Sequence, residues 1–496
     1  MCSKFRHQPS LSPIEGGILD MGESSYETDV LVIGAGPGGY SAAFRAADLG
    51  MEVTLVDLEK RPGGECLFRG CIPSKTLLYL AELLFDAKRS GEMGVRFDQP
   101  QIDLDRIRAW KDRVVDKLTG GLLTLSKRRK VHLVQGRAIF EGSDRVRLEN
   151  SEASQIRFRH AIIATGSGTT PLNSIPFVKG SRIMDSAGAL ELPEIPRSLL
   201  VLGGGYIGLE LGTFYAAMGS RVTVAVHGDR LLRGADQDLT DVLLFRLKEI
   251  FEAIHYNTRV LSLKERNDGV DVHFEGEADR AEQSFDRVLI AIGRKPNSEK
   301  IGLEKTRVKV DDRGFVVVDE QRRTTDSNIF AIGDVAGEPL LAHKAFREGK
   351  VAAEVIKGMP SAFDVQAIPA IVYTDPQVAW TGLSEEQARK ENRNIKVERY
   401  LWKFSSRATT MGVSDGVTKM ILNPETGRIL GVGICGRNAE GLISEGTLAI
   451  EMGAVAQDLG LTVHPHPTLS EMMMETAELF TGTVTHVLPE KHLTSG

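Results

Sequence analysis

Two units of strand, glycine-rich loop and helix constrain the fold more than any other feature of this sequence. The first runs from an apolar stretch at 29–33 through a glycine-rich loop into an alanine-rich helix at 40–49. Glycines in such a loop let the backbone approach a dinucleotide pyrophosphate at the helix N-terminus. A second apolar stretch at 53–56 then ends in an acid that can accept ribose hydroxyls. This context predicts a dinucleotide site formed by Gly34, Gly36, Gly39 and Asp57; a glycine turn without a ligand is the alternative.

A second unit of the same kind follows. It has a buried strand at 199–202, a glycine-rich loop, and a helix at 209–218 with Glu210 in its first turn. The two loops begin 169 residues apart (203 − 34), so we expect one chain to bind two dinucleotides. The residues of the second loop predicted to contact the nucleotide are Gly203, Gly205 and Gly208.

The second unit departs from the usual pattern at the end of its second strand. That strand, 222–226, ends in Val226, where an acid normally holds the adenosine ribose of NAD. Without the carboxylate, NAD loses a charged hydrogen-bond acceptor worth about 1.5–3 kcal/mol. His227 and Arg233 follow closely and could accommodate a 2′-phosphate. The choice between NAD and NADP is therefore open at this stage.

The stretch 63–75 holds two of the four cysteines, Cys66 and Cys71. In a regular α-helix a step of five residues rises about 7.5 Å, which exceeds the Cα separation of about 7 Å that a disulfide tolerates. A bridge therefore needs a bent chain, and Gly70 permits one. We expect a small, reducible disulfide rather than a structural one. Two ordinary thiols are the alternative, and a zinc site would need four ligands where no second cysteine pair exists.

Length and charge narrow the class of protein. A chain of 496 residues is too long for one core and should form about three domains. The net charge of −6 gives no sign of nucleic-acid binding. No apolar run reaches the length of a membrane span, and the first 25 residues lack the apolar stretch of a secretory signal. We expect a cytoplasmic protein that binds neither nucleic acid nor membrane, with a disordered N-terminal tail.

Two later strands suggest a return to the first nucleotide domain. The apolar stretches at 285–292 and 328–332 each end in a glycine turn, at Gly293 and at Gly333-Asp334. Asp334 is well placed there for a ribityl or ribose hydroxyl. A solvated turn is the alternative for this aspartate.

The last third of the chain changes character to alternating strand patterns followed by two helical stretches. This pattern predicts an antiparallel sheet with helices on one side. Near its end Pro467 would terminate any preceding helix. His466 is then left at the start of the next helix with Glu471 near enough to orient its ring, an arrangement suited to a general base. A purely structural His-Pro turn is the alternative.

Two dinucleotides and a dithiol in one chain suggest electron transfer between a nicotinamide, a flavin and a disulfide. The motifs, in order, also resemble those of the flavoprotein disulfide reductases, over nearly all of residues 28–487. Within that family they are most similar to the branch that oxidises dihydrolipoamide. The segments that carry the resemblance are 66–75, both glycine loops, 291–294, 332–334, 341–344 and 464–471.

The resemblance implies an α/β fold of two Rossmann-like dinucleotide-binding domains and a C-terminal α+β dimerisation domain. It also implies a homodimer that takes FAD and NAD, with NADP not excluded, and a lipoyl-bearing protein as substrate. The implied boundaries are a tail at 1–25, the first part of the FAD domain at 26–160, the NAD(P) domain at 161–284, a segment completing the FAD domain at 285–352, the dimerisation domain at 353–488 and a tail at 489–496.

The resemblance also implies roles for the site residues. Cys71 would face the flavin and Cys66 would exchange with the lipoyl dithiol. Lys75, paired with Glu210, would sit near flavin N5, and its charge together with a helix N-terminus would favour the Cys71 thiolate. His466, oriented by Glu471, would act as acid and base at the disulfide of the partner subunit. The remaining implied cofactor contacts are Asp57, Gly136, Asp334 and Ala342 for FAD, and Val226, Val260 and Gly293 with the second glycine loop for NAD.

The sequence departs from the family at three places. Phe68-Arg69 replaces the Asn-Val common between the cysteines, and Asp57 and Val226 each stand for a glutamate. An NADPH-dependent reductase similar to glutathione reductase is the nearest alternative enzyme. A mercuric reductase would carry a C-terminal cysteine pair, and a transhydrogenase would lack one or both of the cysteines. A lipoyl-protein-binding subunit without catalysis is the alternative of another class.

Overall fold

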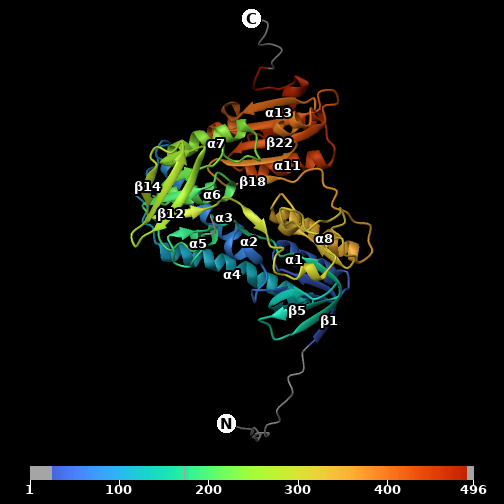
Figure 1. Ribbon diagram of the computed structural model, residues 1–496. Helices are drawn as coiled ribbons and strands as arrows, with labels where there is room; N and C mark the ends of the chain where they lie inside the picture. The colour runs from blue at the N-terminus through green and yellow to red at the C-terminus, as the bar shows by residue number, and fades with distance from the viewer. Residues whose placement is uncertain (1–24, 173–174, 176, 489–496) are drawn as a thin grey trace, which may run out of the picture.

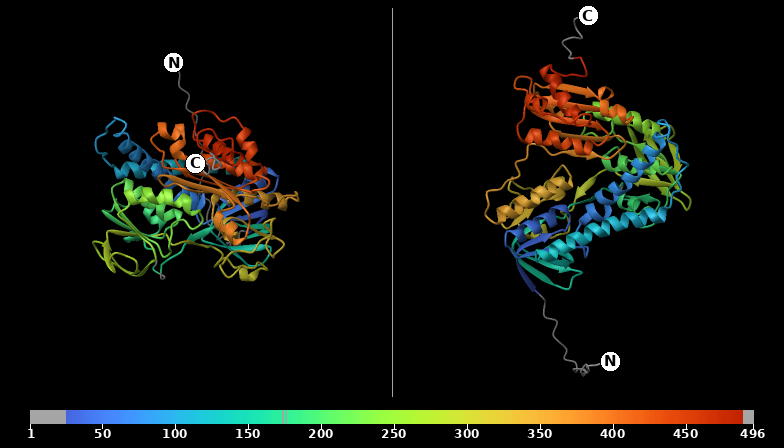
Figure 2. Two further views of the ribbon diagram at one scale, coloured as in Figure 1. Left: turned by 90° about the horizontal axis from the view of Figure 1, so that it is seen from above. Right: turned by 180° about the vertical axis from the view of Figure 1, so that it is seen from behind.

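The computed structural model describes residues 25–172, 175 and 177–488. The expected tails at 1–25 and 489–496 therefore lie outside the described residues, except for Ser25. Two α/β units lie side by side, and the C-terminal sheet with its helices lies across one end of them (Figure 1). Figure 2 shows the same arrangement from above and from behind.

The first sheet has seven strands in the order β3-β2-β1-β6-β5-β4, with β17 also paired to β6. Its central strands β2, β1 and β6 are parallel and are apolar and buried toward their carboxyl ends, where α1 and α8 cover one face and β4, β5 and the segment 301–335 cover the other. On one face α1 and α8 lie close together, and a side chain on Gly349 would contact the Gly38 carbonyl. The bounds are β1 (Ser25–Ile33), α1 (Pro37–Asp48), β2 (Val53–Asp57), β3 (His132–Gln135), β4 (Arg137–Phe140), β5 (Arg145–Glu149), β6 (Gln155–Ile163), β17 (Ile329–Ala331) and α8 (Ala342–Ile356).

The second sheet is parallel, in the order β11-β10-β9-β15-β8, and a three-stranded antiparallel sheet packs beside it. The stretch 285–292, expected to return the chain to the first sheet, pairs instead with β9 and β8, which corrects that prediction. Only 328–332 returns to the first sheet, through β17. The bounds are β8 (Ile183–Met184), β9 (Ser198–Leu202), α6 (Tyr206–Ala217), β10 (Arg221–Ala225), α7 (Gln237–Ile250), β11 (Ala253–His255), β12 (Thr258–Glu265), β13 (Val270–Gly276), β14 (Glu282–Phe285) and β15 (Arg287–Ile290).

The third sheet is antiparallel, in the order β18-β19-β22-β21-β20, as the alternating sequence pattern predicted. Its helices α11 and α13 share one hydrophobic cluster on one face, while α7 of the second unit packs against the other face. The sequence pattern predicted strands at 370–374, 396–402, 417–422 and 429–435, but not β19. The bounds are β18 (Ala370–Val372), β19 (Gln377–Gly382), β20 (Lys396–Leu401), β21 (Val417–Leu422), β22 (Ile429–Gly436), α11 (Ala439–Glu451) and α13 (Glu471–Thr481).

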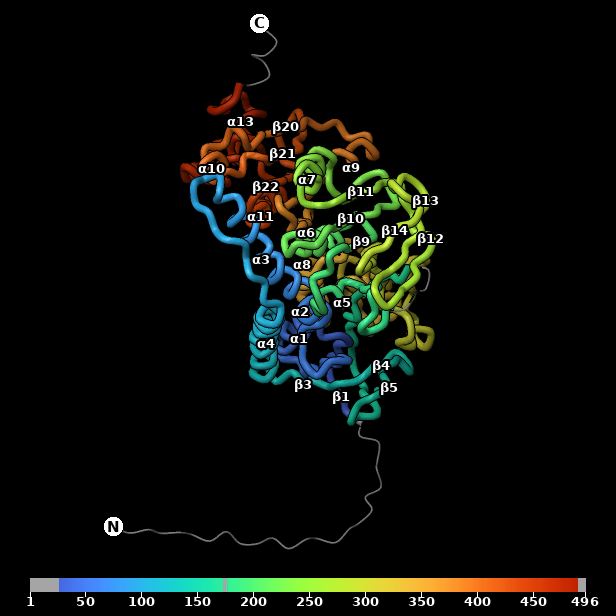
Figure 3. Tube along the Cα trace, turned by 90° about the vertical axis from the view of Figure 1, so that its left-hand side faces the viewer, coloured from blue at the N-terminus to red at the C-terminus, as the bar shows by residue number. Residues whose placement is uncertain are grey.

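A run of helices connects the first two units. It consists of the short α2 (Gly64–Arg69), α3 (Cys71–Arg89) and the long α4 (Leu104–Arg128). The apolar face of α3 enters the core formed with α6, so α2 and the start of α3 lie between the two units (Figure 3). The shorter elements are β7 (Ser167–Thr169), α5 (Ser186–Leu190), β16 (Arg294–Pro296), the 3-10 helices Leu303–Lys305, Gly333–Ala336 and Trp402–Phe404, α9 (Glu385–Lys390), α10 (Ser406–Thr410) and α12 (Ala456–Leu461).

Candidate active site

A cavity of about 620 Å³ extends from the carboxyl ends of β1 and β2, past the two cysteines, to the start of α8. It brings together residues predicted from four distant parts of the sequence. The predicted residues that line it are Gly34, Gly36, Asp57, Cys66, Cys71, Lys75, Gly136, Glu210, Asp334 and Ala342.

Gly34 and Gly39 of the first glycine loop pack so closely against neighbouring backbone that a side chain at either position would overlap it. Gly34 has a φ of +103°, and a Cβ there would overlap the Ala164 carbonyl. A Cβ on Gly39 would overlap the Gly34 carbonyl, so the strand and helix meet closely. Helix α1 starts at the cavity and has no acid in its first turn, which leaves its N-terminus attractive to a phosphate group. The residues present therefore fit the pyrophosphate of a dinucleotide.

Asp57 closes the strand that follows this loop. Its carboxylate accepts hydrogen bonds from the backbone N–H groups of Ala35 at 2.6 Å and Glu59 at 2.8 Å. Burial raises the pKa of Asp57, and the two backbone hydrogen bonds oppose that shift. Each carboxylate oxygen has two acceptor positions, so ribose hydroxyls can still bind. Gly136, with a φ of +157°, lies beside it and donates its N–H to the Asp57 carbonyl at 2.8 Å.

The chain bends between the two cysteines, as predicted, because a regular helix would hold them too far apart for a disulfide. Helix α2 ends at Arg69 and α3 begins at Cys71, with Gly70 between them at φ −137° and ψ −116°. A Cβ on Gly70 would lie only 3.0 Å from the Glu65 carbonyl oxygen and 3.2 Å from the Cys66 Cα. The glycine thus allows the close approach of the two cysteines, which the structure holds as free thiols.

The two thiols have opposite tendencies to ionise. A hydrogen bond from the Cys66 side chain lowers the pKa of Cys71 to about 7; burial opposes this shift, and the Lys75 charge adds to it. The same hydrogen bond, with burial, raises the pKa of Cys66. Cys71 is also the first residue of α3, where the helix dipole favours an anion. The thiolate therefore forms on Cys71 and the proton stays on Cys66.

Lys75 and Glu210 form the ion pair expected beside the thiols. Lys75 Nζ lies 2.8 Å and 3.0 Å from the two Glu210 carboxylate oxygens. Burial alone would lower the pKa of Lys75, but the Glu210 and Cys71 charges outweigh it and the pKa is raised. Tyr373, which the sequence reading missed, donates its backbone N–H to Glu210 at 3.0 Å and places its ring 4.5 Å from the Lys75 ammonium.

A second group of polar contacts fixes Asp334 at the far end of the cavity. Ser167 Oγ donates to the Asp334 carboxylate at 2.5 Å, and Arg294 Nε donates to Ser167 Oγ at 2.8 Å. Arg294 also lies 3.6 Å from the Glu65 carboxylate on α2. The sequence reading identified Asp334 but neither Ser167 nor Arg294 as partners.

The turn that carries Asp334 rests on a buried carboxylate. Glu348, fully buried on α8, accepts the Gly333 N–H at 2.6 Å and pairs with Arg322 at 2.8 Å and Lys344 at 3.2 Å. Lys344 in turn donates to the carbonyls of Gly333 and Gly337 at 3.2 Å and 2.9 Å. The position of Asp334 therefore depends on this hydrogen-bonded turn as well as on the contacts of its own side chain.

Phe68 and Arg69, the unusual residues between the cysteines, make contacts outside the thiol pair. Arg69 pairs with Glu59 at 2.9 Å and lies 3.8 Å from Glu65. The guanidinium of Arg61 lies 5.5 Å from the centre of the Phe68 ring. These contacts attach α2 to the chain that follows β2.

His466 and Glu471 form the predicted pair, with His466 Nδ1 2.8 Å from the Glu471 carboxylate. The second carboxylate oxygen of Glu471 accepts the Thr468 N–H at 2.6 Å, so its orientation is fixed. Neither residue lines the cavity described above. Helix α13, which begins at Glu471, lies at the top of the molecule in Figure 1, whereas α2 lies near its middle.

The second glycine loop also has the shape of a nucleotide site. Gly203 has a φ of +114°, and a Cβ there would overlap the Ala291 carbonyl. A Cβ on Gly208 would lie 2.8 Å from the Gly203 carbonyl oxygen, whereas one on Gly205 would meet nothing within 4 Å, so Gly205 borders open space. Gly293 follows β15 with a φ of +139°. Val226 and Val260 are both buried, and Val260 packs in the hydrophobic cluster behind the sheet.

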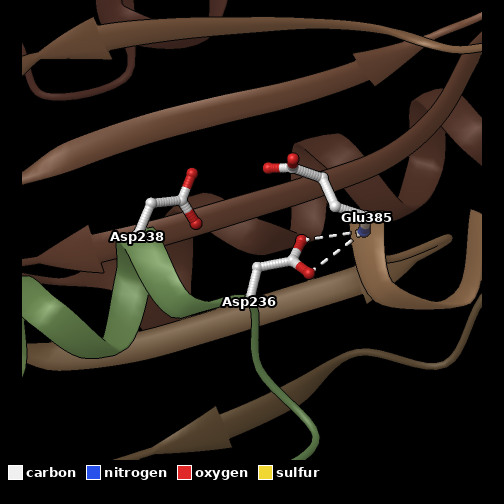
Figure 4. Close-up of side chains that lie close together, drawn as sticks. All are labelled: Asp236, Asp238 and Glu385. Atoms are coloured by element: carbon white, nitrogen blue, oxygen red, sulfur yellow. Dashed lines mark hydrogen bonds between the residues drawn. The ribbon is translucent and has the colours of Figure 1, made fainter. Parts of the chain in front are cut away.

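Three carboxylates, those of Asp236, Asp238 and Glu385, lie close enough together to hold a metal ion (Figure 4). The Lys419 ammonium, almost fully buried, already contacts all three, at 2.7, 2.9 and 2.5 Å. This cluster joins α7 of the second unit to the third sheet, because Asp236 and Asp238 flank the start of α7 and Lys419 lies on β21. We read it as a structural contact between domains.

Sequence comparisons place this arrangement among known proteins. Residues 28–349 match the family model described as pyridine nucleotide-disulphide oxidoreductase, and residues 368–477 match the dimerisation domain of the same family. A dihydrolipoyl dehydrogenase of Vibrio cholerae is 44% identical over 461 residues, covering 92% of this chain and 97% of the relative. One of Geobacillus stearothermophilus is 44% identical over 469 residues, covering 94% and 99%.

Solved structures agree with the family matches. LpdA from Mycobacterium tuberculosis superposes with a TM-score of 0.83 at 25% identity, covering 91% of this chain and 99% of that one. The HOCl-induced flavoprotein disulfide reductase RclA from Escherichia coli gives 0.81 at 28% identity, with the same coverage. None of the helices in the described part of the chain has both the length and the apolar character that a membrane crossing requires.

Proposed function

We infer that this chain, which belongs to the pyridine nucleotide-disulphide oxidoreductase family, is a dihydrolipoamide dehydrogenase. It would oxidise protein-bound dihydrolipoamide to lipoamide and pass the two electrons to NAD. The observation that carries this proposal is the Cys66–Cys71 pair beside the Lys75–Glu210 ion pair in the cavity that begins at the first glycine loop. The dihydrolipoyl dehydrogenases that are 44% identical over nearly the whole chain support the choice of substrate.

The cavity fits FAD. The first glycine loop and the N-terminus of α1 would hold its pyrophosphate, Asp57 and Gly136 its adenosine, and Asp334 and Ala342 its flavin side. When bound, FAD supplies a two-electron acceptor for the thiols and a hydride donor for the pyridine nucleotide. Since Lys75 lines this cavity, its positive charge would stabilise negative charge on either the thiol or the cofactor.

Thiol–disulfide exchange would be carried out by the chain's own residues. In the oxidised enzyme a thiolate of dihydrolipoamide attacks Cys66 and breaks the Cys66–Cys71 bond, which leaves Cys71 as a thiolate. The second lipoyl thiolate then attacks the mixed disulfide, releasing lipoamide and a reduced Cys66. Two electrons and two protons have now passed from dihydrolipoamide to the enzyme. The low pKa of Cys71 makes it a good leaving group in the first step and the thiol that gives up electrons afterwards.

His466 would act as the base that takes the lipoyl proton. Its Nδ1 faces the Glu471 carboxylate, so the basic nitrogen Nε2 points away from that carboxylate. Because the pair lies far from the cavity of its own chain, the proposal places it at the cysteines of a partner subunit in a homodimer. The match of residues 368–477 to a dimerisation domain supports this assembly. The expected cytoplasmic location stays a prediction.

The test is the rate of NAD reduction by dihydrolipoamide with the purified FAD-loaded protein. We expect rapid turnover in the native protein and loss of turnover to background in Cys66→Ser. Reduction of an artificial dye by NADH, which does not use the thiols, should persist in that variant and serves as the control for folding. No dihydrolipoamide oxidation with either nucleotide, together with reduction of glutathione disulfide by NADPH, would replace this assignment by the glutathione-reductase-like alternative.

A further inference from the structure

The adenosine end of the second nucleotide site lacks the acid that usually selects NAD. Val226 follows β10 directly, and its two methyl groups would lie 3.1 Å from a Cβ on Gly204 of the glycine loop. The buried valine thus fills the position beside the loop with apolar atoms. Val226 therefore has no carboxylate that could bind the ribose hydroxyls or repel a phosphate.

The chain after Val226 folds back onto the same loop and brings an arginine with it. Leu232 donates its N–H to the Gly204 carbonyl at 2.9 Å, which holds the next residue, Arg233, near the loop. The Arg233 guanidinium lies directly against Gly228, and a side chain at Gly228 would overlap it. The glycine therefore provides the space in which this guanidinium reaches the end of β10.

The neighbouring charges leave Arg233 available to a ligand. Arg230 is paired with Glu386 of α9 and donates to the Arg233 carbonyl at 3.1 Å, so it anchors the backbone of Arg233. Arg233 lies 3.6 Å from Asp229, and both side chains are more than two-thirds exposed (69% and 77%). An exposed pair at this distance is weak, and a doubly charged phosphate would compete with it. His227, also exposed, adds a second group that can donate to a phosphate.

We propose that this site accepts the 2′-phosphate of an adenosine ribose, so that the enzyme uses NADP as well as NAD. The proposal deepens the function given above and rests on that function for the reaction catalysed. The binding of the 2′-phosphate does not depend on that function. Arg233 and His227 would bind the phosphate, and Val226 would admit it without repulsion. Asp229, which competes for Arg233, would limit the preference for NADP over NAD.

The test is direct binding of two nucleotide fragments to the FAD-loaded protein by calorimetry. The fragments are 5′-AMP and 2′,5′-ADP, which differ only in the 2′-phosphate. We expect 2′,5′-ADP to bind at least as tightly as 5′-AMP. A charge-assisted hydrogen bond contributes roughly tenfold or more to affinity. Arg233→Leu should therefore weaken the binding of 2′,5′-ADP by about tenfold and leave the binding of 5′-AMP unchanged.

Two matched variants test the remaining parts of the proposal. Val226→Glu restores the acid and should shift the ratio of the two affinities toward 5′-AMP by about tenfold or more, with a parallel shift of kcat/KM from NADP to NAD. Asp229→Asn removes the competing carboxylate and should strengthen the binding of 2′,5′-ADP without changing that of 5′-AMP.

Tighter binding of 5′-AMP than of 2′,5′-ADP by tenfold in the native protein would overturn the proposal, as would an Arg233→Leu variant with unchanged selectivity. Since neither ligand involves the thiols, failure of dihydrolipoamide oxidation would sink the proposed reaction and leave the binding result standing. Conversely, dihydrolipoamide oxidation with NAD alone would overturn only the present inference.

Discussion

At the scale of single residues, the ionisation of Cys71 depends on its nearest neighbour more than on the nearby cation. The Cys66 thiol donates a hydrogen bond that favours the Cys71 thiolate, and Lys75 adds a smaller stabilisation. The residue types predicted a reactive thiol near a lysine. The family resemblance implied the Cys71 thiolate from the Lys75 charge and a helix N-terminus, whereas the contribution of Cys66 depends on how the two thiols lie in the structure.

This dependence predicts a difference between two variants of Cys66. In Cys66→Ser a hydroxyl can still donate to Cys71, so alkylation of Cys71 should rise with pH through a midpoint near 7. In Cys66→Ala the donor is lost, and the midpoint should move up toward the ordinary thiol pKa of about 8.5. Mass spectrometry of Cys71 after timed alkylation across a pH series measures both. Equal midpoints in the two variants would contradict the assigned hydrogen bond.

At the scale of elements, the turn Gly333–Ala336 is held by groups distant in the sequence from the cofactor motif it carries. Glu348 on α8 accepts the Gly333 N–H, while Lys344 and Arg322 neutralise the carboxylate. An isolated Gly-Asp pair after a strand predicts a cofactor contact. The reason the turn keeps its shape lies in a buried ion cluster one helix away.

We expect Glu348→Gln to weaken this turn strongly. The amide can still accept the Gly333 N–H, but the buried Lys344 would lose its counter-charge, which costs about 3–5 kcal/mol. The variant should unfold at a lower temperature and lose FAD during gel filtration. Glu338→Gln, which removes an exposed pair with Arg313 next to the same turn, is the matched control and should change neither property. Full FAD retention in Glu348→Gln would show that the turn does not need the charge.

At the scale of the whole molecule, the proposed catalytic groups do not meet within one chain. The thiols and the Lys75–Glu210 pair lie between the two nucleotide units, and the His466–Glu471 pair belongs to the third domain. The Lys419 cluster fixes the third domain to the second, so a bending of one chain would have to break a buried ion network to bring them together. A second copy of the chain is the simpler way to complete the site.

This arrangement predicts complementation between two inactive variants. His466→Gln should lower dihydrolipoamide oxidation by about 10²–10⁴-fold, as loss of a general base does, and Cys66→Ser should abolish it. Coexpressed in equal amounts, the two chains would form mixed dimers in which one of two sites is intact, giving about one quarter of native activity. Mixing the purified variants without subunit exchange is the control. Activity no greater than that of the separate variants would place both groups in one chain.

Local patterns were sufficient to predict the nucleotide-binding strands and loops. Buried parallel strands need continuous apolar residues, and a loop that approaches a pyrophosphate needs glycine, so both leave marks in the sequence. The bend at Gly70 was predictable for the same kind of reason, because a helix cannot bring residues five apart within disulfide range. The pairing of 285–292 with the second sheet was not predictable, because the apolar residues of a strand do not show which of two sheets it joins.

Local sequence patterns were enough to identify the chemical groups of this protein: two glycine-rich loops suited to dinucleotides, a thiol pair, and a histidine followed by a glutamate that can orient it. These depend on short-range constraints that act within a few residues of each motif. The partners of these groups became visible in the folded chain, where Tyr373 contacts Glu210, Glu348 supports the Asp334 turn, and Arg233 lies against Gly228 beside the second loop. Such contacts join residues far apart in the chain, and their geometry arises from packing that no local pattern specifies.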